Sequence, residues 1–222
     1  MKSTPAPATH NPHLLGLMPP NLRRVVEVGC STGLLGKAYC ESNPGCDYVG
    51  VEIDPDHAAA AAQGCSSVVN LDIERTDDPR FDGLFPSDCW VFGDSLEHLR
   101  DPWALLTWVR GRLAADACVV ACIPNAQHWS IQARLNRGEL RYEESGLLDR
   151  THLRWFTRIT IRELFMSTGF NIVQGVPVIF NQPGRDLVLQ SIRAMATALG
   201  ADPELAVADA MATQYVVRAV PA

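Results

Sequence analysis

The fold class is decided by the stretch Val25-Val26-Glu27-Val28-Gly29-Cys30-Ser31-Thr32-Gly33-Leu34-Leu35-Gly36. Valines around a single acid predict a short strand over Arg24–Val28, and the pattern after the first glycine predicts a helix over Ser31–Glu41. Glycines between the two let the backbone turn tightly and approach a ligand without a Cβ in the way. A strand, a glycine-rich turn and a helix in this order are typical of the ligand-binding edge of an α/β sheet.

The rest of the chain continues the alternation of apolar runs and helical patterns that is typical of a parallel sheet with crossover helices. Further strands are expected at Asp47–Ile53, Ser67–Leu71, Asp88–Phe92, Ala117–Ile123, Asn171–Ile179 and Tyr215–Val220. Further helices are expected at Pro55–Gln63, Pro102–Leu113, Ile159–Thr168 and Asp186–Leu199, with a short one after Pro203. We therefore predict an α/β fold with a doubly wound, mostly parallel seven-stranded sheet, helices on both faces and an antiparallel last strand.

The domain organisation is expected to be simple, because 222 residues fit one α/β domain. Residues 1–20 are rich in Pro, Ala and Thr and predict a flexible N-terminal arm without the apolar core of a signal peptide. Residues 21–222 then form the single domain. Residues 124–158 break the regular rhythm and are rich in Arg, His and aromatic residues, so they predict an inserted lid over the substrate.

Composition restricts the partners. The net charge of −6 makes a nucleic-acid partner unlikely, and no apolar run is long enough to span a membrane. The seven cysteines include no CxxC pair and mostly lie in apolar runs, which favours reduced core thiols and a cytoplasmic protein. A small-molecule acceptor is the expected partner, and the helix Asp186–Leu199 leaves a homodimer open.

The glycine spacing separates two classes of cofactor. Gly29, Gly33 and Gly36 lack the central G-x-G of dinucleotide-binding turns. Glu27 stands two residues before the first glycine, where its carboxylate would repel a pyrophosphate but suit an ammonium and a sulfonium. This E-x-G-x-x-x-G string resembles motif I of class I (Rossmann-like) S-adenosylmethionine-dependent methyltransferases.

That resemblance implies roles for the acids that end the next strands. Glu52 lies 19 residues after Gly33 and would accept hydrogen bonds from the ribose diol, whereas Asp54 is better explained as a helix cap. Asp72 would receive the adenine amino group, and Ile73 would pack on the ring. The residues expected to bind the cofactor are Glu27, Gly29, Cys30, Ser31, Gly33, Glu52, Ile53, Asp72, Ile73, Asp94 and Ser95.

Three later stretches contain the candidate catalytic and substrate-binding residues. The string Asp94-Ser95-Leu96-Glu97-His98-Leu99 resembles the "LEHL…DP" region of many bacterial methyltransferases, and "IPNxxHW" with "LLDRTHLRxFT" resembles methyltransferases encoded among polysaccharide and glycosyl-transfer functions. His152 is the candidate general base, with His98 as a second catalytic candidate. Either histidine could instead only anchor its loop. The expected substrate contacts are Asn125, His128, Trp129 and Arg150.

A metal site is a weaker hypothesis. Asp94, Glu97, His98 and His152 resemble the E-x-x-E-H…H metal ligands of small-RNA 2′-O-methyltransferases, but the first position here is Asp. We therefore expect S-adenosylmethionine as cofactor, with a divalent metal possible but not favoured.

The function predicted from the sequence is methyl transfer to an oxygen, less readily a nitrogen, of a small polar acceptor such as a sugar or glycan precursor. Arginines of the lid, among them Arg134 and Arg137, could select an anionic acceptor or simply form a solvated face. The alternatives are an NAD(P)-dependent oxidoreductase on the same architecture and a non-catalytic S-adenosylmethionine-binding protein.

Overall fold

The computed structural model describes residues 8–222, and its centre is a seven-stranded sheet with strand order β3-β2-β1-β4-β5-β7-β6. The strands are β1 (Arg24–Val28), β2 (Asp47–Glu52), β3 (Ser67–Asn70), β4 (Cys89–Gly93), β5 (Cys118–Pro124), β6 (Phe170–Val178) and β7 (Gln214–Pro221). Neighbouring strands from β3 to β5 pair in parallel, and β7 runs antiparallel between β5 and β6. The predicted mostly parallel sheet with an antiparallel last strand is confirmed.

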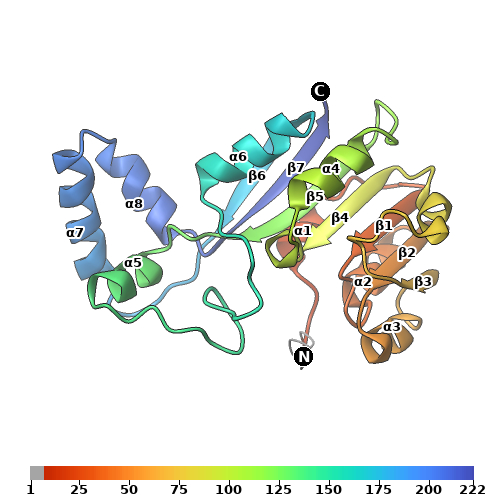
Figure 1. Ribbon diagram of the computed structural model, residues 1–222, viewed down its shortest axis with the longest axis horizontal. Coiled ribbons are helices and arrows are strands. Elements are labelled where there is room, and N and C mark those ends of the chain that lie inside the picture. Colours follow the sequence, from red (N-terminus) through yellow and green to blue (C-terminus); the bar gives the residue numbers. More distant parts are fainter. Residues whose placement is uncertain (1–7) are drawn as a thin grey trace.

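Helices cover both faces of the sheet (Figure 1). On one face, α1 (Pro12–Leu17), α2 (Leu34–Ser42) and α3 (Pro55–Ala61) bury side chains such as Leu14 and Tyr39. On the other, α4 (Pro102–Arg110) and α6 (Arg158–Ser167) close a core that contains Trp90 and Phe165. All seven cysteines are free and six are buried. None of the helices in residues 8–222 combines the length and apolar character needed to cross a bilayer.

Asp-Pro pairs set the start of several helices. Asp54, Asp101 and Asp202 each accept hydrogen bonds from backbone amides of the helix that follows, and a proline occupies the next position in each case. The carboxylate satisfies amides that have no partner within the helix, while proline lacks the amide that would be unpaired there. The assignment of Asp54 as a helix cap is confirmed.

Among the predicted boundaries that differ from the structure, two lie near the start of the chain. Helix α2 begins at Leu34 rather than Ser31, because Ser31 (φ 48°) and Gly33 (φ 76°) adopt left-handed conformations that a helix cannot contain. The arm expected over residues 1–20 is too long. Helix α1 lies within it, and Leu14 and Leu17 are buried against the sheet. The first seven residues of that expected arm lie outside the described residues.

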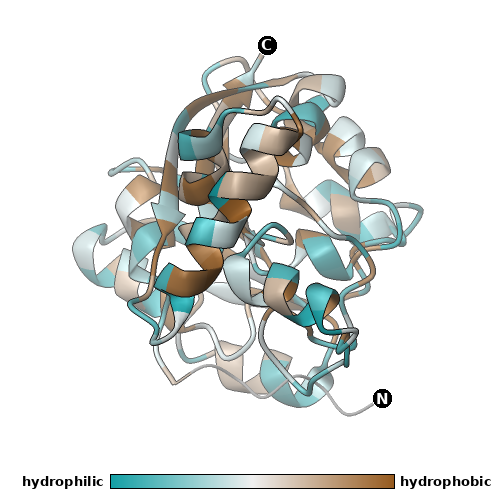
Figure 2. Cartoon of the chain, turned by 90° about the vertical axis from the view of Figure 1, so that its left-hand side faces the viewer, coloured by the Kyte–Doolittle hydropathy of each residue, from teal (hydrophilic) through white to brown (hydrophobic). Residues whose placement is uncertain are grey.

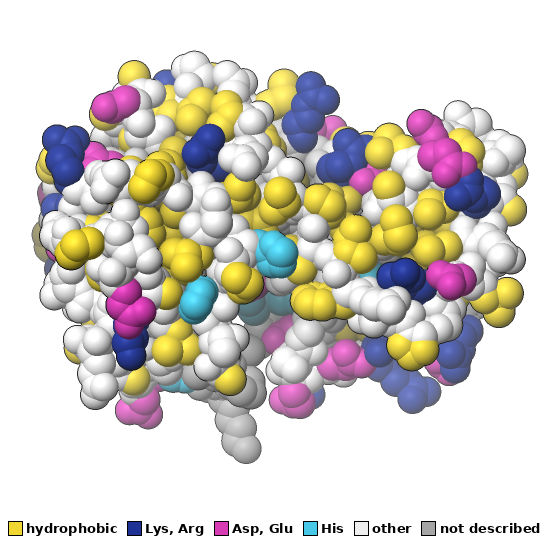
Figure 3. All heavy atoms as spheres, turned by 180° about the vertical axis from the view of Figure 1, so that it is seen from behind, with side chains coloured by type: hydrophobic (Ala, Val, Ile, Leu, Met, Phe, Trp, Pro, Cys, Tyr) yellow, Lys and Arg dark blue, Asp and Glu magenta, His cyan; other side chains and the backbone are white. Residues whose placement is uncertain are grey.

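The chain after β5 builds a lobe at one end of the sheet. Helices α5 (Trp129–Asn136), α7 (Arg185–Ala198) and α8 (Pro203–Met211) group together there, away from β1–β3 (Figure 1). Apolar and polar residues alternate along these helices in Figure 2, and apolar side chains remain on the molecular surface in Figure 3. Leu187 of α7 is 74% exposed, and Leu199, which directly follows the helix, is 77% exposed. The homodimer that the sequence leaves open at this helix is not tested.

Candidate functional site

A cavity of about 1010 Å³ opens at the carboxyl ends of strands β1 to β4. Its wall combines the turns after these strands with lid residues between Gly146 and His152, the start of β7 at Gln214, and residues 9–11 before α1. This volume lies at the upper end of the range typical of ligand sites, so the cavity has room for a nucleotide-sized cofactor and a second small molecule.

The turn after β1 forms one wall. Gly29 has φ 73°, and a Cβ added there would lie 3.3 Å from Cβ of Ser95. Cys30 and Ser31 also line this wall. The carboxylate of Glu27 is buried and accepts a hydrogen bond of 3.0 Å from the Tyr48 hydroxyl. Burial raises the pKa of Glu27 well above its usual range, although the Tyr48 hydroxyl acts in the opposite direction.

The acid after β2 organises the next wall. Glu52 accepts the backbone amide of Ser31 at 2.8 Å with one oxygen and that of Asp54 at 3.0 Å with the other. The two turns after β1 and β2 are thereby tied to one carboxylate, which also faces the cavity. Ile53 lies beside it and is 65% exposed. An apolar residue this open beside a cavity offers a surface to a bound ring.

The turn after β3 completes the first half of the cavity. Asp72 and Ile73 both line the cavity, and Asp72 accepts the backbone amide of Glu74 at 3.0 Å. The structure therefore brings together the three acids that the sequence places at successive strand ends. Gly33 differs from the rest of the expected set because it does not line the cavity. A Cβ at Gly33 would lie 2.8 Å from the Ala61 carbonyl oxygen, so this glycine permits α2 and α3 to approach.

The end of β4 leads to the second half. Asp94 lines the cavity in a left-handed conformation (φ 53°) and accepts a hydrogen bond from the Gln214 side-chain amide. Its surface is open to the cavity, but the surrounding protein disfavours the charged form and raises the pKa of Asp94 to about 6. Gln214 was not predicted. It reaches the site because β7 runs antiparallel to β5 and pairs Gln214 with Pro124 at the end of that strand.

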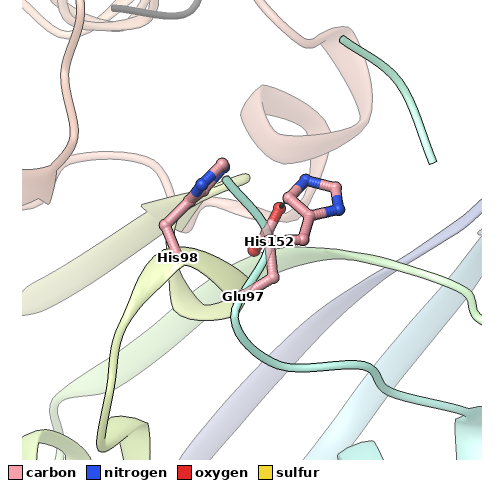
Figure 4. A group of neighbouring side chains, drawn as sticks. All are labelled: Glu97, His98 and His152. Atoms are coloured by element: carbon pink, nitrogen blue, oxygen red, sulfur yellow. Dashed lines mark ion pairs between the residues drawn. The ribbon is translucent and has the colours of Figure 1, made fainter. Parts of the chain in front are cut away.

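A polar cluster of Glu97, His98 and His152 lies deeper in this half (Figure 4). Nε2 of His152 is 4.0 Å from Oε1 of Glu97, and the centres of the two imidazole rings are 4.8 Å apart. In Figure 4 the Glu97 carboxylate points toward the His152 ring, and His98 lies on its other side. The two predicted catalytic histidines, 54 positions apart in the sequence, are thus neighbours.

Backbone hydrogen bonds assemble the cluster. The carbonyl oxygen of Glu97 accepts the amides of Leu153 and Arg154 at 2.8 and 2.9 Å, which fixes the lid segment against the turn after β4. The ring of His98 contacts the hydroxyl of Thr151 through Nδ1 at 3.0 Å. That hydroxyl donates in turn to Asp149 at 2.6 Å. The orientation of His98 therefore depends on the lid.

Burial shifts the protonation of all three members. It raises the pKa of Glu97 well above its usual range, and the nearby Asp94 acts in the same direction. It lowers the pKa of His98 and of His152, and for His152 the neighbouring His98 contributes further. Both imidazoles are thus held neutral at pH 7, with a ring nitrogen available to a proton or a ligand.

The residues expected to contact substrate lie outside the cavity. Asn125 is fully buried, and its amide donates to the carbonyls of Asp209 and Ala212 at 2.7 Å each. His128 is buried at the start of α5, where its ring accepts the Ser130 amide. Trp129 is half-buried in α5, and Arg150 is exposed and forms an ion pair with Glu144. The structure does not bring these four residues to the cavity wall, and their contact with an acceptor stays a prediction.

The first half of the cavity fits S-adenosylmethionine. Glu27, Glu52 and Asp72 line this half. The contacts expected from them, with the ammonium, ribose and adenine amino groups of that molecule, stay predictions. Ser31 and Ser95 also line this cavity, and their hydroxyl oxygens are buried with no hydrogen-bond partner within residues 8–222. Buried polar atoms without partners at a cavity wall are suited to a polar ligand.

Comparison with solved structures supports the fold described above. A methyltransferase from Mesorhizobium loti, described as S-adenosylmethionine-dependent, is 18% identical with a TM-score of 0.61, covering 94% of this chain and 96% of that chain. A chain in the complex of the Haloferax volcanii Trm112 activator with a methyltransferase is 16% identical with a TM-score of 0.61, covering 95% and 88%. Magnesium protoporphyrin IX methyltransferase from Synechocystis PCC 6803 is 12% identical with a TM-score of 0.58, covering 93% and 77%.

No curated protein matches the sequence. A family model described as a methyltransferase domain matches residues 4–175, which include every residue that lines the cavity except Thr213 and Gln214. The chain therefore belongs to the methyltransferase domain family and is an S-adenosylmethionine-dependent methyltransferase.

Proposed function

We propose that the protein transfers a methyl group from S-adenosylmethionine to a hydroxyl oxygen, less readily a nitrogen, of a small polar acceptor. One observation carries this proposal: the cavity continues from the cofactor half into a polar cluster that contains His98 and His152. An acceptor hydroxyl needs a group that removes its proton, and this cluster offers two neutral imidazoles.

The chemistry requires alignment and one proton transfer. The sulfonium of the cofactor supplies an activated methyl carbon. The acceptor oxygen attacks that carbon in line, the new C–O bond forms as the C–S bond breaks, and the hydroxyl proton must leave. Because burial keeps His152 neutral, it can accept that proton directly when nothing else occupies its ring nitrogen.

A sugar or glycan precursor remains the proposed class of acceptor. Support comes from the polar lining of the second half of the cavity, where Asp149, Thr151 and Gln214 present groups able to contact hydroxyls. Three lid arginines give little support for an anionic acceptor. Arg134, Arg137 and Arg150 each form an ion pair with a glutamate, which compensates their charge.

The test starts with binding. Isothermal calorimetry with S-adenosylhomocysteine should show one site per chain, and NADH should not bind. Binding of NADH without S-adenosylhomocysteine would instead favour an oxidoreductase. An acceptor screen that begins with sugars and nucleotide-linked sugars should then identify turnover, whereas cofactor binding without turnover across the screen favours a non-catalytic protein.

The histidine assignment has its own test. His152→Ala should keep S-adenosylhomocysteine affinity within about threefold and lose at least ~100-fold in turnover, the scale of a lost proton-transfer group. His13→Ala is the matched control, because His13 is an exposed residue of α1 that does not line the cavity. Unchanged turnover in His152→Ala would remove His152 from the chemistry.

A further inference from the structure

We propose that Glu97, His98 and His152 bind one divalent transition-metal cation, and that this cation holds the acceptor hydroxyl beside the methyl donor. The inference rests on the proposed function and deepens it by naming a second bound group at the same site.

The Glu97 side chain is the first observation that points to a ligand. It is 1% exposed, and neither carboxylate oxygen meets the geometry of a hydrogen bond to another described residue. Nε2 of His152 lies 4.0 Å from Oε1 of Glu97, which is too far for a hydrogen bond. A buried carboxylate without partners is costly, and a bound cation removes that cost by supplying charge and coordination together.

The spacing of the three side chains is the second observation. One ligand atom from each of Glu97, His98 and His152 lies within 4.8 Å of the others. Tetrahedral coordination at about 2.0–2.2 Å places ligand atoms roughly 3.4 Å apart, so small rotamer adjustments close the site. Two imidazole nitrogens and one carboxylate suit Zn²⁺, Mn²⁺ or Fe²⁺ better than Mg²⁺, which prefers oxygen ligands and bound water.

The surroundings orient the ligands as metal sites require. Nδ1 of His98 contacts the carbonyl oxygen of Thr151 at 3.2 Å and its hydroxyl at 3.0 Å, which leaves Nε2 for a cation. Asp149 accepts the Thr151 hydroxyl and so fixes it. Such outer contacts set the tautomer and the direction of ligating histidines.

The structure assigns three protein ligands to the cation, whereas the motif resemblance in the sequence suggested four. The carboxylate of Asp94 is engaged by the side-chain amide of Gln214 and is not part of the compact group. Three protein ligands leave a position open, as in catalytic metal sites. Because the cluster lines the cavity, that position is accessible to the acceptor.

The cation would change how the hydroxyl loses its proton. A hydroxyl bound at the open position has a lowered pKa, so it releases its proton to solvent and the resulting oxygen anion attacks the methyl carbon. The C–O bond forms, the C–S bond breaks, and the products are the methyl ether, S-adenosylhomocysteine and one proton. With the cation bound, His152 is a ligand and no longer the proton acceptor.

The test is calorimetry on protein dialysed against EDTA and then freed of it, titrated separately with Mn²⁺, Zn²⁺ and Mg²⁺. Mn²⁺ is the deciding probe because it has little affinity for the chain's buried thiols. Wild type and His13→Ala should bind one Mn²⁺ per chain. His98→Ala and His152→Ala should each weaken binding at least ~100-fold, and Thr151→Val about 10- to 100-fold. The inference is overturned if wild type does not bind Mn²⁺, or if both histidine variants bind Mn²⁺ as tightly as wild type does.

The same samples separate this inference from the proposed function. S-adenosylhomocysteine should bind the metal-free protein, and Mn²⁺ should then restore turnover that EDTA removes. Full turnover in EDTA refutes the metal site and leaves the methyltransferase reaction intact with His152 as the base. Failure of S-adenosylhomocysteine to bind in either state refutes the proposed function itself.

Discussion

Replacing Glu52 by glutamine tests how the cofactor half of the cavity is held together. Each oxygen of Glu52 accepts one backbone amide, from Ser31 on one side and Asp54 on the other. Glutamine has a single side-chain oxygen, so one of these two amides must lose its acceptor and face an NH₂ group. The ribose diol also exchanges a charged acceptor for a neutral one.

The magnitude follows from these contacts. A hydrogen bond to a charged group contributes about 1.5–3 kcal/mol, and 1.4 kcal/mol corresponds to a tenfold change in affinity. Loss of one such bond to the ribose therefore predicts S-adenosylhomocysteine binding that is weaker by about 10- to 100-fold. Displacement of the Ser31 turn, which forms part of the same wall, would add to that loss.

Asp54→Asn is the matched control. Asparagine caps helices about as well as aspartate, so this variant should keep α3 and should bind S-adenosylhomocysteine within about threefold of wild type. Calorimetry at pH 7.5 on both variants, with circular dichroism to confirm folding, measures the difference. If Asp54→Asn loses as much affinity as Glu52→Gln, or if Glu52→Gln binds normally, the assignment of Glu52 to the ribose is wrong.

Three further predictions concern stability. Burial lowers the pKa of His128 to about 4 from an ordinary 6.5, so the unfolded chain binds more protons between these pH values. The contribution of His128 to stability should be complete above pH 6.5 and fall by about 3 kcal/mol as the pH drops to 4. His128→Asn, which keeps the cap of α5, should flatten this part of the pH profile of denaturation. Gly33→Ala should cost about 2–3 kcal/mol in urea unfolding because its Cβ would strike the Ala61 carbonyl, whereas Gly138→Ala, also left-handed but with nothing within 4 Å, should cost about 1 kcal/mol. Asn125→Ala should destabilise by about 2–4 kcal/mol and leave S-adenosylhomocysteine affinity within threefold, because its amide satisfies backbone carbonyls outside the cavity; a large loss of affinity with normal stability would contradict this structural role.

The cofactor half could be predicted from the sequence because its determinants are local. Glu27, Glu52 and Asp72 lie at or just after the ends of successive strands, and parallel strands bring such positions to one edge of the sheet. Periodicity alone locates those strands. The place of Gly33 outside the cavity wall has the same local origin, since a glycine near a turn can serve the ligand or the packing of a neighbouring helix, and only the position of Ala61 reveals the packing contact.

The acceptor half could not be predicted to the same depth because its contacts are long-range. Asn125 and His128 follow β5 as a substrate loop would, but Asn125 binds carbonyls near residue 210 that no sequence pattern connects to it. Gln214 enters the site only through the antiparallel register of β7. His98 and His152 were identified as candidates, yet their contact depends on two backbone hydrogen bonds to Glu97.

Glu97 provides the strongest argument for a chemical role of the acceptor half. The backbone carbonyl of Glu97 holds the lid segment by accepting hydrogen bonds from the amides of Leu153 and Arg154. Any residue at this position would supply that carbonyl. The side chain contributes nothing to this contact, and its buried, unpartnered carboxylate destabilises the fold relative to an apolar side chain of similar size. Glu97→Leu should therefore be at least as stable as wild type in the absence of metal while losing the ability to bind Mn²⁺. A Glu97→Leu variant that is several kcal/mol less stable in EDTA would show that the carboxylate serves the fold, and the case for a cation between Glu97, His98 and His152 would lose its strongest support.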